Sequence, residues 1–141
     1  MEQRLSLVTL GVDNVAMSRA FYERLGWKAS SASNESVVFF QLGNMALGLF
    51  GRAALAEDAN IPNNGSGFGG IALAQNMPSK EAVDQLLDEA KRAGARILKP
   101  AQSVFWGGYS GYFSDLDGHP WEIAWNPGFD LLDDGGLRLP D

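Results

Sequence analysis

The stretch LSLVTLGVDNVAMSRAFYERLGW, residues 5–27, places a strand pattern directly before a helix pattern. Side chains of residues 5–12 alternate between two faces, one of which is strongly apolar, and this pattern is typical of a strand. Asp13 or Asn14 can cap the helix that follows, and Gly26 can end it. The predicted apolar stripe of this helix comprises Met17, Ala20, Phe21 and Leu25. The opening therefore predicts a β–α unit.

Two further strands complete the first half of the chain. Residues 36–51, SVVFFQLGNMALGLFG, form two apolar runs on either side of the turn pair Gly43-Asn44. Residues 53–66 are rich in Gly, Asn and Pro, which indicates a connector. We assign three aromatic side chains of the strands to the core, the last of them at the border of a pocket: Phe39, Phe40 and Phe50.

The pattern then restarts. Residues 67–75 predict a strand, and residues 78–94 predict the clearest helix in the chain, capped by Ser79 and ended by Gly94. The predicted apolar stripe of this helix comprises Ala82, Val83, Leu86, Leu87 and Ala90. Three more strands are predicted over residues 95–100, 110–115 and 120–126.

A strand–helix–strands pattern thus occurs twice, which predicts an α+β fold of two βαβββ modules within a single domain. Module one covers about residues 4–52, and residues 53–66 connect it to module two, about residues 67–127. Residues 128–141 are predicted to be an irregular acidic tail.

Composition excludes several classes of function. The 141 residues are 45% hydrophobic and 20% charged, which is typical of a soluble globular protein. Eleven basic residues against 17 acidic ones, a formal net charge of −6, argue against nucleic-acid binding. No apolar run is long enough to cross a membrane, and the start lacks the apolar region of a signal peptide. With no cysteine, we expect no disulfide and a cytoplasmic location.

Both ends of the pattern resemble one superfamily. Residues 7–27, with FY…LGW, resemble the opening strand and helix of the vicinal oxygen chelate superfamily, which includes glyoxalase I, bleomycin-resistance proteins and extradiol dioxygenases. Residues 115–127, DLDGHPWEIAWNP, resemble its closing turn and its strand bearing a glutamate. Residues 105–127 are also similar to an uncharacterised glyoxalase-like branch. The resemblance implies one curved mixed sheet, with helices on its convex face and the ligand on its concave face.

The resemblance also bears on metal binding. Metal-dependent members hold a divalent ion with four side chains, and these positions fall at Leu7, Gly48, Gly70 and Glu122. Leucine and glycine offer no side-chain donor, whereas a zinc or transition-metal site needs about three protein ligands. We therefore expect no metal and no other cofactor. Magnesium can use one or two carboxylates beside a phosphate, so a residual metal ligand at Glu122 remains the alternative.

Glu122 is the candidate catalytic residue. In a strand its carboxylate points away from the face of Trp121 and Trp125. It can act as a general base or pair with a cationic ligand, and the other interpretation is a relic acid bonded to backbone or water. The concavity that the resemblance implies would also be lined by Leu7, Thr9, Gly48, Phe50 and Gly70.

The stretch FWGGYSGYF, residues 105–113, alternates aromatic residues with glycines. Trp106, Tyr109 and Tyr112 could form a stacking wall for a planar or cationic ligand. The other interpretation is a glycine-rich hairpin whose aromatic rings fill the core or a dimer interface.

The only histidine, His119, follows the turn pair Asp117-Gly118, where a side chain is usually exposed and without function. Asp115 and Asp117 resemble the start of a calcium loop, but the twelfth position is Asn126 where such a loop needs glutamate. We therefore predict a turn.

Two functions follow from these residues. The first is metal-free binding of a small organic molecule in the concave sheet, as in bleomycin-resistance proteins. The alternative is a glyoxalase-like lyase or isomerase with Glu122 as base or residual metal ligand. A metal-dependent dioxygenase conflicts with Leu7 and Gly48. Free strand edges predict a homodimer.

Overall fold

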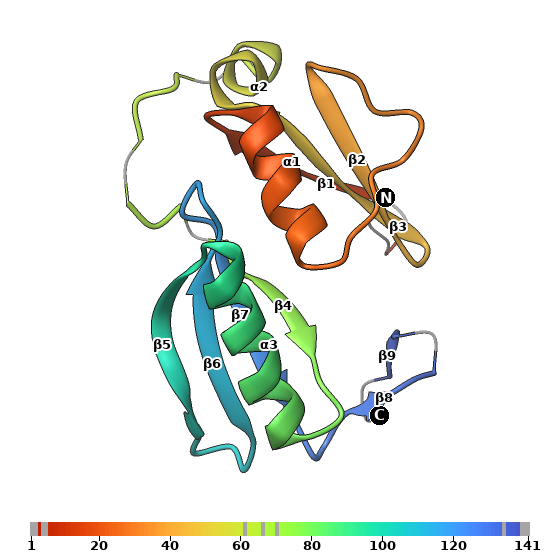
Figure 1. The fold of residues 1–141 in the computed structure, drawn as a ribbon, viewed down its shortest axis with the longest axis vertical. Helices are drawn as coiled ribbons and strands as arrows, with labels where there is room; N and C mark the ends of the chain where they lie inside the picture. Colours follow the sequence, from red (N-terminus) through yellow and green to blue (C-terminus); the bar gives the residue numbers. More distant parts are fainter. Residues whose placement is uncertain are drawn as a thin grey trace. The chain divides into compact units, whose positions relative to one another are not determined.

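Two compact units, residues 1–69 and 70–141, make up the chain. Each unit has its own sheet, with a helix across one face of that sheet (Figure 1). This arrangement confirms the predicted α+β class. The computed structural model describes residues 3, 6–60, 62–65, 67–69, 71–133 and 135–138.

The first unit contains a three-stranded sheet in the order β1-β3-β2. Strand β3 pairs in parallel with β1 and antiparallel with β2. An isolated bridge between Ala29 and Phe40 extends the sheet beyond β2. The elements are β1 (Leu7–Val12), α1 (Val15–Arg24), β2 (Val37–Leu42), β3 (Met45–Gly51) and α2 (Arg52–Asp58).

The second unit contains a four-stranded sheet in the order β4-β7-β6-β5. Strand β7 pairs in parallel with β4 and antiparallel with β6, as β3 does with its two neighbours. The two units therefore share one topology, and in the first unit the bridge at Ala29 stands in the place of β5. The elements are β4 (Leu73–Asn76), α3 (Lys80–Ala93), β5 (Arg96–Ser103), β6 (Tyr109–Ser114), β7 (Pro120–Trp125), β8 (Asp130–Leu131) and β9 (Leu137–Arg138).

Helix ends follow the sequence signals. The side chains of Asn14 and Ser79 accept hydrogen bonds from the amides of Met17 and Ala82, at 2.9 and 3.2 Å, and cap α1 and α3. Gly94 ends α3 at φ 110°, a left-handed conformation that glycine adopts without steric cost. Within the described residues, no helix is long and apolar enough to cross a bilayer.

The buried face of α1 differs from the prediction. Met17 is 61% exposed, whereas Ser18, Phe21 and Tyr22 are buried. The ring of Tyr22 stacks on Trp27 at 5.0 Å and also packs on Phe40. Because this aromatic cluster buries Tyr22, the buried face of α1 is shifted around the helix axis relative to the predicted stripe. Met17 therefore lies on the exposed side. In α3 the predicted stripe is buried at Val83, Leu87 and Ala90.

Two other boundaries differ from the prediction. The strand predicted over residues 67–75 begins only at Leu73, and Gly70 lies outside the described residues. Gly67 has φ 82° in the preceding glycine-rich segment, a conformation that is incompatible with a strand. The tail that was predicted to be irregular contains the short antiparallel pair β8 and β9.

Candidate functional site

Side chains of β6 and β7 alternate between two faces of the second sheet. On one face, Gly111 lies beneath α3, since a Cβ added to it would lie 2.7 Å from Leu87 Cδ1. Phe113 and Trp121 share this face and stack at 6.2 Å between ring centroids. The other face therefore carries Ser110 and Tyr112 of β6, with Glu122 and Ala124 of β7.

The face opposite α3 contains an open hollow of about 340 Å³. Its lining residues come from β5, β6 and β7 and from the loop that joins β5 to β6. Most of its lining side chains are polar, and the loop adds the aromatic ones. They are Lys99, Gln102, Ser103, Val104, Phe105, Trp106, Ser110, Tyr112 and Glu122.

Three of these residues form a row across the strands. Lys99 pairs with Tyr112 in the β5–β6 register, and Tyr112 pairs with Glu122 in the β6–β7 register. All three are half-buried. Burial, together with the charge of Glu122 and the hydrogen bond to it, raises the pKa of the Tyr112 phenol above its ordinary value. The phenol of Tyr112 is therefore neutral beside Glu122 at neutral pH.

Gly111 brings β5 close to β6 beside this row. Around the position of its missing Cβ, Lys99 O and Ala101 N both lie at 2.9 Å. The register of β5 is irregular on both sides of Lys99, between Ile97 and Lys99 and between Lys99 and Gln102. A glycine is thus required where an irregular strand approaches its neighbour closely, and the irregularity sets the position of Lys99.

The loop over residues 104–108 supplies the aromatic wall of the hollow. Hydrogen bonds from Val104 N to Gly108 O and from Gly107 N to Val104 O close it, at 3.1 and 3.0 Å. A Cβ at Gly108 would lie 1.7 Å from the Trp106 ring, so the ring rests directly against that glycine. Trp106 remains 39% exposed, and Phe105 is fully exposed. One face of an indole is therefore available to a ligand.

Tyr109 lies on the opposite face from this wall. Its hydroxyl donates to Asp84 Oδ1 at 2.9 Å, and Lys80 Nζ lies 5.8 Å from its ring centroid. Both partners belong to the region of α3. The expected wall of Trp106, Tyr109 and Tyr112 is therefore split, because Tyr109 and Tyr112 differ by an odd number of positions in one strand and point to opposite faces.

The candidate residues of the first unit share one face of their own sheet. A Cβ at Gly48 would lie 3.3 Å from Thr9 Oγ1, 3.4 Å from Phe39 Cε1 and 3.6 Å from Leu7 Cδ1. Phe50, two residues beyond Gly48 in β3, is on the same side. The structure thus brings Leu7, Thr9, Gly48 and Phe50 together on a mainly apolar surface. Phe40, on the other side, is buried in the core.

Leu7, Gly48 and Glu122 do not supply the three or more donor side chains that a zinc or transition-metal site needs. Leu7 and Gly48 offer no donor side chain, and the nearest polar neighbours of Glu122 in the row are a phenol and, beyond it, an ammonium. Among the described residues, no group of three or more His, Asp or Glu side chains is close enough to hold an ion. Neutral or charged organic groups suit this donor set better than a divalent cation.

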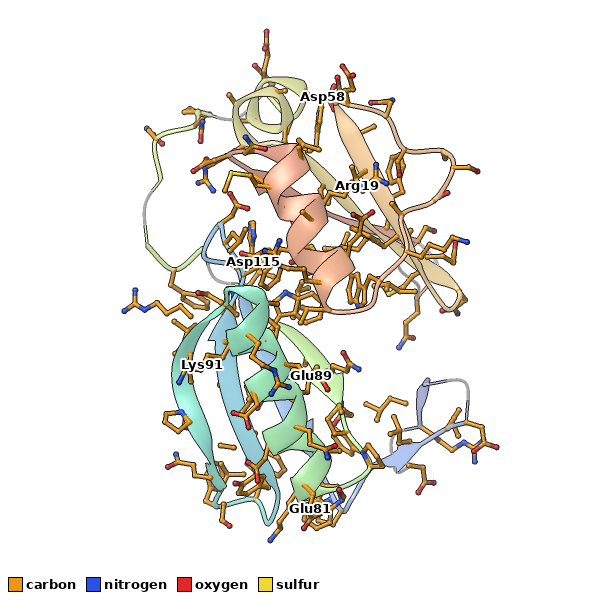
Figure 2. The ribbon with its side chains drawn as sticks, in the orientation of Figure 1. Arg19, Asp58, Glu81, Glu89, Lys91 and Asp115 are labelled. Atoms are coloured by element: carbon orange, nitrogen blue, oxygen red, sulfur yellow. The ribbon has the colours of Figure 1, made fainter. Side chains whose placement is uncertain are left out.

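Asp115 and His119 form a structural turn at the end of β6, where Figure 2 labels Asp115. The carboxylate accepts hydrogen bonds from the backbone amides of Asp117 and His119, at 3.0 and 2.8 Å. His119 Nδ1 also lies 2.8 Å from Asp115 Oδ2. These contacts explain the buried aspartate and confirm the predicted turn, although His119 is half-buried rather than exposed.

Several lining residues were not predicted from sequence, among them Lys99, Gln102, Ser103 and Ser110. Their positions depend on the pairing of β5 with β6, and that pairing is irregular. Ser110 was within reach of prediction, because it lies two residues before Tyr112 on the same strand face.

Comparison with known proteins gives a consistent result. The family model described as Glyoxalase/Bleomycin resistance protein/Dioxygenase superfamily matches residues 4–123. A glyoxalase-related enzyme from Fulvimarina pelagi is 32% identical, covers 99% of this chain and 100% of its own, and has a TM-score of 0.89. Hypothetical protein SA1046 from S. aureus is 25% identical, covers 89% and 95%, and has a TM-score of 0.76.

A lactoylglutathione lyase from Agrobacterium tumefaciens is 22% identical, covers 89% of this chain and 96% of its own, and has a TM-score of 0.67, which shows a shared fold alone. No curated protein matched the chain. The family match over most of the chain and the identity to the F. pelagi protein show that this protein belongs to the glyoxalase/bleomycin resistance protein/dioxygenase superfamily.

Proposed function

We propose that the protein binds a small organic molecule, without a metal ion, in the hollow on the sheet face opposite α3 in the second unit. The hollow itself carries this proposal. Its volume of about 340 Å³ lies at the lower end of the range for small-molecule sites, roughly 300–1,000 Å³. The strands supply polar side chains and the loop supplies aromatic ones. In small-molecule sites, polar groups usually orient the ligand and aromatic groups supply most of the contact area.

Glu122 is the anchor of the site in this proposal. It is the one carboxylate among the lining residues, and the neutral phenol of Tyr112 lies beside it in the β6–β7 register. A half-buried carboxylate favours a ligand with a hydrogen-bond donor or a positive charge. Trp106 supplies a flat surface on which such a ligand stacks.

A ligand screen by calorimetry tests the proposal directly. Planar aromatic compounds and cationic drugs would be titrated into untagged protein in the presence of EDTA. We expect binders whose affinity falls about tenfold or more in Glu122→Ala. Glu89→Ala is the matched control, because Glu89 is an exposed carboxylate on α3 (Figure 2). Binding that requires added metal, or that Glu89→Ala weakens as much as Glu122→Ala does, would contradict the proposal.

The position of Glu122 in the lining of the hollow favours a second function. A carboxylate held beside a small-molecule hollow can remove a proton from a bound substrate, as in a lyase or isomerase with Glu122 as base. Ligands from the screen would be incubated with the protein and followed by mass spectrometry. Turnover that is abolished by Glu122→Gln would establish catalysis, and turnover that Glu122→Gln leaves unchanged would remove Glu122 from the mechanism.

A further inference from the structure

The row across β5, β6 and β7 contains two opposite charges that do not meet. Within the part of the chain that the structure describes, neither Lys99 nor Glu122 makes an ion pair. Both side chains are half-buried. Charged groups that lose part of their hydration are normally compensated by a partner. Each of these two charges therefore lacks the partner that a ligand could provide.

The strand register explains why the two charges stay apart. Tyr112 lies between Lys99 and Glu122, one strand from each. Two strand spacings separate the backbones of Lys99 and Glu122 by roughly 9.5 Å. The phenol that lies between them is neutral, so it does not neutralise the charge of the carboxylate. The row thus presents a positive and a negative group, with a neutral spacer between them, to the same hollow.

The aromatic wall adds a third element of recognition. Gly107 has φ 89° and allows the tight loop, while Gly108 leaves space for the Trp106 ring. The indole is packed against backbone on one side and remains 39% exposed. A ring fixed in this way costs little conformational entropy when a ligand stacks on it.

We propose that the ligand class is a zwitterion with a planar aromatic ring: its anionic group binds Lys99, its cationic group binds Glu122, and its ring stacks on Trp106. This inference rests on the proposed function, because it names the chemistry of the molecule that the hollow binds. A ligand with only one charge would leave the other half-buried charge without a partner. A zwitterion satisfies both and adds no net charge to the site.

The test compares ligands that differ by one charge. The probes are L-tryptophan and glycyl-L-tryptophan, which separate their charges by different lengths, each with its C-terminal amide and its N-acetyl derivative. Affinities would be measured by calorimetry at pH 6.5 in EDTA, where the α-amine is charged. We expect at least one zwitterion to bind about tenfold or more tightly than both of its singly charged derivatives.

Two substitutions assign each charge to its residue. Lys99→Met should remove the preference for the zwitterion over its amide and keep the preference over the N-acetyl form. Glu122→Gln should do the reverse. Lys91→Met and Glu89→Gln on α3 are the matched controls and should change neither preference, since both side chains are exposed (Figure 2). Thermal unfolding of each variant would confirm that it is folded.

Three outcomes separate this inference from the proposed function. A zwitterion preference that follows the two substitutions supports both. Equal affinity for zwitterions and singly charged derivatives, or no binding of these probes while other compounds bind in a manner dependent on Glu122, would overturn the zwitterion and leave the binding function standing. Failure of the probes and of the wider screen would overturn both.

Discussion

Gly111→Ala is the substitution that the packing of the second unit opposes most clearly. The new methyl group would lie 2.7 Å from Leu87 Cδ1 and 2.9 Å from both Lys99 O and Ala101 N. Real Cβ contacts essentially never fall below 3.0 Å. Leu87 can rotate, but the two β5 backbone atoms can move only if β5 shifts relative to β6.

The magnitude follows from two opposing effects. Overpacking against a paired strand typically costs about 1–3 kcal/mol, and two of the three close contacts here are with backbone, which favours the upper half of that range. Replacing glycine by alanine recovers about 0.5–1 kcal/mol of chain entropy. We expect a net loss of about 2 kcal/mol in the free energy of unfolding, equivalent to a fall in Tm of roughly 4–8 °C.

Urea denaturation followed by tryptophan fluorescence measures this loss, because Trp106, Trp121 and Trp125 all belong to the second unit. Gly128→Ala is the matched control in the same unit. Its nearest atom would be Asn126 Oδ1 at 3.4 Å, so the change should stay within about 0.5 kcal/mol. Equal midpoints for Gly111→Ala and wild type would refute the close approach of β5 to β6, and with it the position of Lys99.

Three further predictions concern single groups. Asp115→Ala should cost about 2–3 kcal/mol in urea unfolding, because its carboxylate accepts two backbone N–H groups; Asp115→Asn should cost less, and an equal cost would contradict the assigned bonds. Ser79→Ala should lower the free energy of unfolding by about 1 kcal/mol, because it removes the cap of α3, and Ser79→Asp should restore that stability. Urea unfolding followed by circular dichroism measures both. The phenol of Tyr112 should titrate above the ordinary value of 10.0, as measured by ultraviolet difference against Tyr112→Phe, and Glu122→Gln should lower that pKa. Because the folded-state pKa is raised, the stability from the neutral phenol is present below about pH 10 and is lost as the pH rises through the folded pKa; an unchanged titration in Glu122→Gln would contradict the pairing.

The fold was largely predictable because local signals repeat. Capping residues at Asn14 and Ser79 and the glycine at Gly94 mark helix ends by their own chemistry. The turn at Gly43 adopts the positive φ, 58°, that its sequence favours. The strand at residues 67–75 was overextended because alternation continues through glycines, whose backbone freedom works against a strand.

The site was only partly predictable. Alternation in β7 correctly separated Glu122 from Trp121 and Trp125, because it needs only the position of one strand. Lys99 required the register of β5 with β6, which is irregular and depends on contacts at Gly111. Tyr109 was grouped with Tyr112 because both are aromatic neighbours, although strand geometry places them on opposite faces.

We propose that the protein binds a small molecule, without metal, on the face of the second unit's sheet that lies opposite α3. The most direct test is a ¹H–¹⁵N NMR titration, in EDTA, of isotope-labelled protein with a ligand from the screen. Binding in the hollow should cause the largest shifts at the amides of Lys99, Ser110, Tyr112 and Glu122 and at the indole N–H of Trp106. Shifts confined to α3 or to the first unit, or shifts that appear only after a divalent metal is added, would contradict it.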